Sequence, residues 1–299
     1  MGTICDESRN STKIRYPTKF TKPTRQNNNT LGYVNYDEAP ICKDNTSGNE
    51  NYILGEIVIN KDLVNKDARI INSYEAYERS IGKTTFDENI RNEIEIRKCN
   101  IYIEGKLIPF SYFYKFDKKG TFKIKYCFQN NLKSLYALFC QCYYIKTLNF
   151  SNFNTNDVTS TEYMLYDCSQ LKELNLTNFN TNNVTNMQYM FNNCRSLREL
   201  NLSSFNTNNV TNMQYMFNYC LSLKELSLSS FNTNNVTNMQ NMFYYCSSLT
   251  NLDLSNFKTQ KKTDLNNMFK YCENLTKSLL ICYDKNILDA ASYYKYYNF

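Results

Sequence analysis

A cysteine recurs every 26 residues along the second half of the chain, and this repeat limits the folds open to it more than any other feature. The stretch FNTNNVTNMQYMFNNC at 179–194 returns almost unchanged from Phe205 and again from Phe231. A unit of this length cannot bury its own apolar face, so successive units must stack and share one continuous core. The repeated cysteines are Cys142, Cys168, Cys194, Cys220, Cys246 and Cys272.

Each unit joins a strand pattern to a helix pattern. Leucine alternates with asparagine at 174–176, as in a strand with one buried face. Met187, Met190, Phe191 and Cys194 follow at the i, i+3, i+4 and i+7 positions of one helix face, after residues of the N-cap type. The pattern predicts an α/β solenoid with a parallel sheet on one face and short helices on the other.

The units LKELNLTNFNTNNVTNMQYMFNNC and LRELNLSSFNTNNVTNMQYMFNYC resemble the BspA-type leucine-rich repeats of microbial and protist surface proteins. The resemblance covers about residues 125–280, and the period lies within the 20–29 residues of leucine-rich repeats. It implies a leucine-rich-repeat solenoid of about six units and a role in adhesion or protein binding. It implies no catalytic site common to the family.

The rest of the chain divides into three further segments. Residues 1–50 are rich in Asn, Thr, Ser and Lys without periodicity, which predicts a disordered tail. Residues 51–127 alternate apolar and polar positions between turn signals, which predicts a small β-rich domain. We expect its last strand to become the first strand of a solenoid over 128–280. Residues 281–299, with a tyrosine-rich end, would form a C-terminal cap.

Asparagine replaces the usual turn residues in the repeats. No Gly or Pro follows Gly120. Asparagine is the common alternative to glycine in left-handed backbone conformations. We therefore expect asparagine to occupy the left-handed positions of the repeat turns.

The composition excludes several kinds of function. Histidine is absent, so the chain has no histidine general base or histidine metal ligand. A thiol-dependent enzyme with Cys140 and Cys142 at its centre is the lower-ranked alternative, because no histidine is present to activate a thiolate. The net charge of +6 is too dispersed to indicate nucleic acid, and no run of about 18 apolar residues would cross a membrane. No catalytic residue, metal site or cofactor is predicted.

The outward positions of the predicted strands form the candidate binding surface. Like residues of successive units would lie in rows, with an acidic row beside a basic row. We expect a non-enzymatic protein-binding or scaffold protein, with a cell-surface adhesin as the alternative. The predicted protein-binding residues are Lys172, Glu173, Asn175, Arg198, Glu199, Asn201, Lys224, Glu225 and Asp253.

The cysteines and the N-terminus bear on location. Helices pack about 8–10 Å apart, whereas a disulfide needs Cα atoms within about 7 Å, so the repeated cysteines are expected to stay reduced. Reduced cysteines, and residues 1–30 without an apolar leader, favour the cytoplasm or the inner face of a membrane over the cell surface. Acylation of Gly2 and Cys5 would provide peripheral membrane attachment, although Asp6 departs from the myristoylation motif.

Overall fold

The computed structural model describes residues 42, 50–276 and 278–293 of the 299-residue chain, all within the unit Tyr33–Phe299. The fold is mixed α/β, with sheets and few helices. Its N-terminal module contains β1 (Tyr52–Ile59), a short 3-10 helix η3 (Lys61–Leu63), β2 (Asp67–Arg69), α1 (Tyr74–Ser80), α2 (Glu93–Ile96), β3 (Asn100–Ile103), β4 (Lys106–Ile108), β5 (Phe113–Lys115) and β6 (Gly120–Cys127). The repeats and the C-terminal part contain β7 (Ile145–Asn149), β8 (Glu173–Asn175), β9 (Glu225–Ser227), β10 (Asn251–Leu254), β11 (Leu280–Cys282) and α3 (Lys285–Tyr293).

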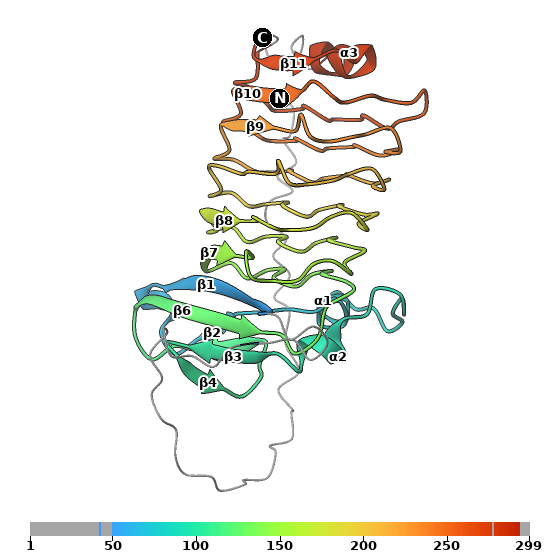
Figure 1. Ribbon diagram of the computed structural model, residues 1–299. Coiled ribbons are helices and arrows are strands. Elements are labelled where there is room, and N and C mark those ends of the chain that lie inside the picture. Colours follow the sequence, from blue (N-terminus) through green and yellow to red (C-terminus); the bar gives the residue numbers. More distant parts are fainter. Residues whose placement is uncertain (1–41, 43–49, 277, 294–299) are drawn as a thin grey trace, which may run out of the picture. The chain divides into compact units, whose positions relative to one another are not determined.

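The largest sheet joins the N-terminal module to the repeats (Figure 1), in the strand order β4-β3-β6-β1-β7-β8. The expectation that the module's last strand adjoins the repeats is wrong. β1 lies between β6 and β7 and is antiparallel to both. Gly55 of β1 permits the close approach, because a Cβ there would lie 3.2 Å from both the Leu148 side chain and the Thr147 carbonyl oxygen.

Beyond β7, each 26-residue unit forms one coil, and successive coils follow one above another (Figure 1). Strands lie on one side, and a ladder of parallel bridges such as Asn186↔Asn212↔Asn238 follows the other side. Between the two sides, like residues stack in the core. The Phe217 ring lies 5.4 Å from that of Phe191 and 5.5 Å from that of Phe243, nearly parallel to both.

The short helices predicted opposite the sheet are not found in residues 128–276, all of which the structure describes. Alternate N–H groups there donate to the next coil, as from Met187 to Asn212 at 3.0 Å and from Phe191 to Met216 at 3.0 Å. The intervening N–H groups close tight turns, as from Met190 to Met187 at 3.2 Å. An α-helix would keep all of these donors within its own segment, so the bonds between coils replace it.

Asparagine fills only part of the left-handed positions, and in this respect the expectation is wrong. Tyr189, with φ 57°, shows why tyrosine serves there. Its ring stacks on Tyr163 at 4.5 Å and on Tyr215 at 4.6 Å. Such aromatic pairs contribute about 0.5–1.5 kcal/mol each, which offsets a backbone cost of about 1 kcal/mol or more. The left-handed tyrosines are Tyr163, Tyr189, Tyr215, Tyr219, Tyr245 and Tyr271.

At the C-terminal end, β11 pairs with β10 in parallel, and α3 follows with Ile287 fully buried. The remainder of the predicted cap, residues 294–299, lies outside the described residues. None of the helices in the described ranges is long and apolar enough to cross a bilayer.

Candidate functional site

The structure places all nine predicted binding residues on the strand side of the coils. Eight are exposed and Asp253 is partly buried. Side chains alternate along each strand, so Glu173 and Asn175 of β8 point outward while Leu176 is buried. Parallel pairing then aligns like positions, as between Thr147 and Glu173.

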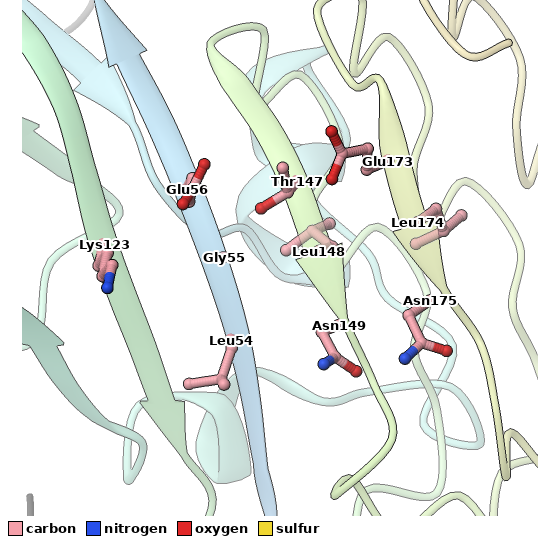
Figure 2. Close-up of a pocket in the computed structure, with 10 residues that line it drawn as sticks. All are labelled: Leu54, Gly55, Glu56, Lys123, Thr147, Leu148, Asn149, Glu173, Leu174 and Asn175. Atoms are coloured by element: carbon pink, nitrogen blue, oxygen red, sulfur yellow. The ribbon is translucent and has the colours of Figure 1, made fainter. Parts of the chain in front are cut away.

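A first groove of about 460 Å³ crosses β6, β1, β7 and β8 (Figure 2). Lys123, Glu56, Thr147 and Glu173 lie in register across these four strands. The Lys146 ammonium lies 3.7 Å from the Glu56 carboxylate, so a basic residue of the first coil reaches this face. Glu56 and Lys123 were missed by the sequence analysis, because no local signal places β1 beside the repeats.

A second groove of about 900 Å³ lies where the strand ladder is interrupted. Residues 199–201 form no strand, and no backbone hydrogen bond of the described residues joins them to β8 or β9. Leu200 is consequently half-buried, whereas the equivalent Leu226 and Leu252 are buried. This groove brings together five predicted residues, namely Arg198, Glu199, Asn201, Lys224 and Glu225.

The charges of this face form two rows, defined here as the acidic row (Glu173, Glu199, Glu225) and the basic row (Lys172, Arg198, Lys224). Within the described ranges, no ion pair joins a member of either row to an opposite charge. The only polar partner printed for these side chains is the Asn251 amide, which donates to Glu225 at 3.1 Å. The charged groups therefore remain available to an external partner.

The amides of the same face serve the fold. Asn175 accepts a hydrogen bond from the backbone N–H of Thr177 at 2.9 Å, and Asn201 accepts one from Ser203 at 3.0 Å. Asp253 holds Ser255 in the same way at 2.9 Å. These bonds close the turn after each strand, so the charged rows are better placed than the amides to contact a partner.

The remaining predicted sites are of two kinds. Gly2 and Cys5, proposed for acylation, lie outside the described residues. Cys140 and Cys142 are fully buried, and burial raises the pKa of the Cys142 thiol to about 12 and that of Cys140 well above its usual value. Both groups are thus protonated near neutral pH and are weak nucleophiles, which opposes the thiol-enzyme alternative. The described residues contain no cluster of Cys, Asp or Glu arranged to hold a metal ion.

The repeated cysteines are free thiols, as predicted, but for a different reason than helix spacing. Each donates to a main-chain carbonyl of an earlier coil, as from Cys194 to Leu165 at 3.3 Å and from Cys220 to Phe191 at 3.2 Å. Each also fills a fully buried position beside the phenylalanine stack, where a small apolar side chain packs well.

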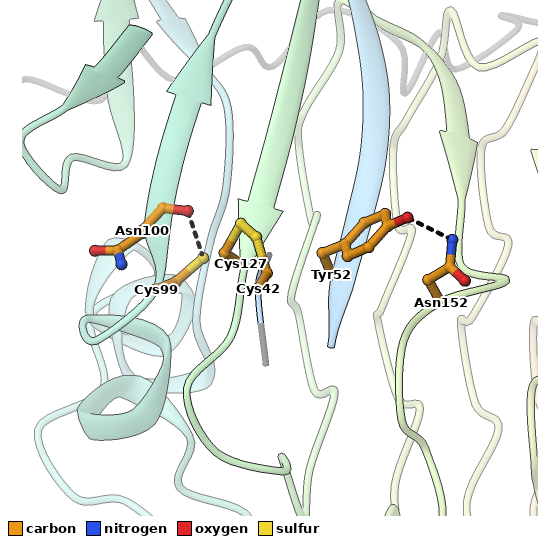
Figure 3. The surroundings of a disulfide bond; sticks show 6 residues. All are labelled: Cys42, Tyr52, Cys99, Asn100, Cys127 and Asn152. Carbon is orange, nitrogen blue, oxygen red and sulfur yellow. Dashed lines mark hydrogen bonds between the residues drawn. A yellow bond between two sulfur atoms is a disulfide. The ribbon is translucent and has the colours of Figure 1, made fainter. Parts of the chain in front are cut away.

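One disulfide joins Cys42 to Cys127 of β6 (Figure 3), with Cα atoms 5.3 Å apart. Cys42 is buried beside Tyr52 and Tyr102. The prediction of a disordered tail over 1–50 is therefore wrong at this residue. Disulfides persist mainly in oxidising compartments, so this bond opposes the location inferred from the free cysteines.

A buried carboxyl pair lies where α1 meets the first coils. Glu78 accepts a hydrogen bond from the Tyr136 hydroxyl at 2.8 Å and forms an ion pair with Lys83. Burial, together with the Glu78 charge, raises the pKa of Glu162 to about 7. Glu162 accepts hydrogen bonds from the Asn186 amide at 2.7 Å and from Gln188 at 2.8 Å. The pair is thus a structural element of the junction.

Glu162→Gln is expected to remove a pH dependence of stability. The folded pKa of about 7 lies above the ordinary 4.5, so wild-type stability is highest below pH 4.5 and falls as pH rises through 7. The variant should exceed the wild type by up to about 3 kcal/mol at pH 8 and match it near pH 4.5. Glutamine fits here, because Gln188 and Gln214 hold the equivalent positions. Denaturant unfolding at both pH values measures this, and an equal difference at the two would contradict it.

Comparison with known proteins adds a family. The family described as "Mycoplasma protein of unknown function, DUF285" matches residues 115–199, 133–226 and 167–281, in overlapping registers that reflect the repeat. No curated protein and no solved structure matches the chain significantly.

Proposed function

The chain belongs to this DUF285 family, whose function is unknown, and we propose that it is a non-enzymatic protein-binding or scaffold protein. The observation that carries the proposal is the strand-side face, where the acidic and basic rows border two neighbouring grooves. Charged groups on an open surface steer and select a protein partner more than they provide affinity. The half-buried Leu174 and Leu200 beneath the rows supply apolar contact area for a partner.

The stacked coils are proposed to be a solenoid of the BspA-type leucine-rich-repeat class. The support is the resemblance of the units, together with parallel pairing at an offset of one unit between β7 and β8 and between β9 and β10. Repeat proteins of this architecture use extended surfaces for binding.

Photo-crosslinking tests where the partner binds. A photo-crosslinking amino acid in place of Glu199, which is exposed in the second groove, should capture a defined protein in cells of the source organism. Asn234 is the matched control, because it is exposed on a loop outside both grooves. Capture from Glu199 alone supports the proposal, whereas equal capture from both positions, or none from Glu199, contradicts it.

A cell-surface adhesin is the second candidate. The Cys42–Cys127 disulfide favours it, because such a bond suits an extracytoplasmic environment. The redox state of these two cysteines in protein taken from cells distinguishes the candidates, as described in the Discussion.

A further inference from the structure

We propose that the strand-side face binds the same face of a second copy of this chain, with the acidic row of each copy against the basic row of the other. This inference rests on the proposed protein-binding function and names the partner of that face.

The first argument is the spacing of the charges. Each row presents the same kind of charge on three successive coils, one unit of 26 residues apart. Neighbouring strands lie about 4.8 Å apart, so a partner that meets every charge needs this same repeat along its surface. A site for a single small ligand would differ from coil to coil. A second copy of the chain matches the spacing by identity.

The second argument is symmetry. The two rows run side by side, since Arg198, Glu199, Lys224 and Glu225 border one groove. A two-fold axis parallel to the rows and midway between them exchanges the rows, so each glutamate meets a basic side chain of the other copy. An axis across the rows would place glutamate against glutamate. The face is thus complementary to itself in one orientation, as an isologous interface requires.

The third argument is that the chain already makes such a contact once. Lys146, one unit before Lys172, pairs with Glu56 of the antiparallel strand β1 at 3.7 Å. Lys172, Arg198 and Lys224 have no such carboxylate among the described residues of their own chain. A second copy would supply one to each, which gives three reciprocal pairs from each row.

Charge exchange tests the proposal on the full-length chain by sedimentation velocity across a concentration series. Wild type should self-associate, and less so at about 1 M salt, where the Debye length falls to about 3 Å. Reversal of the acidic row (Glu173→Lys, Glu199→Lys, Glu225→Lys) should weaken association at least about 100-fold, since six exposed ion pairs are lost. Reversal of the basic row (Lys172→Glu, Arg198→Glu, Lys224→Glu) should do the same.

Mixing the two variants gives the decisive result. One variant carries a wholly basic face and the other a wholly acidic face, so an equimolar mixture should form heterodimers although neither associates alone. The matched control Lys258→Glu, Lys261→Glu, Lys262→Glu carries the same change of charge on exposed lysines of the last coil and should associate like wild type. Circular dichroism melting confirms that each variant is folded before it is compared.

Three results would overturn the inference. These are a wild type that stays monomeric at low salt, row reversals that associate like wild type, and folded variants whose mixture fails to associate. Crosslinking from Glu199 separates this failure from failure of the proposed function. Capture of a different protein would retain protein binding and reject the second copy, whereas absence of any capture would reject both.

Discussion

Phe217→Asp is expected to unfold the central coils and to lower their free energy of unfolding by more than about 4 kcal/mol. Phe217 is fully buried and stacks between Phe191 and Phe243. Loss of a buried phenylalanine side chain alone costs about 3–5 kcal/mol, and the new carboxylate would be buried without a partner. Because coils are stabilised mainly by their neighbours, the damage should spread to the adjoining units.

Hydrogen exchange of peptides from residues 179–260 measures this effect coil by coil, which a single melting curve of a repeat protein does not. Phe217→Leu is the matched control, since it keeps an apolar side chain and should cost only about 1 kcal/mol. Protection of the central coils in Phe217→Asp equal to that in wild type would show that the stacked core is not as described.

Cys42→Ser is expected to lower the free energy of unfolding of the N-terminal module by about 4 kcal/mol. The Cys42–Cys127 bond closes a loop with a sequence separation of 85, and loss of a cross-link over about 100 residues costs about 4.7 kcal/mol in the chain-entropy description. Cys42 is also buried, so its loss removes packing beside Tyr102. Denaturant unfolding under non-reducing conditions measures the change.

The double variant Cys42→Ser/Cys127→Ser and wild type in reductant are its controls, and both should unfold like Cys42→Ser. A wild type that is indifferent to reductant would contradict the prediction. Non-reducing peptide mapping of protein from its own source then bears on location. A Cys42–Cys127 peptide supports the adhesin alternative, whereas free thiols at both positions support a scaffold in a reducing compartment.

The candidate binding face could be predicted from the sequence because it depends on spacing along the chain. The 26-residue period requires stacking, and the alternation at 173–176 sends Glu173 and Asn175 outward whichever strands lie beside them. The same spacing aligns Glu199 and Glu225 with Glu173. Residues at the core positions of each unit, such as Phe217, follow from the same argument.

The helix pattern failed for a physical reason. Met187, Met190, Phe191 and Cys194 face the core at i, i+3, i+4 and i+7, but tight turns whose alternate N–H groups bond to the next coil meet the same spacing. The choice depends on acceptors about 25 residues away, such as Asn212. Tyrosine in left-handed positions likewise depends on the ring of the next coil.

The sequence by itself determined the repeat, the stacked core and the outward rows of charge, because each follows from local periodicity. Only the tertiary structure decided that β1 lies beside β7, that Cys42 joins Cys127, and that the strand ladder opens at 199–201. The units LKELNL, LRELNL and LKELSL are nearly identical, so no local feature marks the open one. These outcomes depend on which distant segments meet, and chain spacing carries no information on that choice.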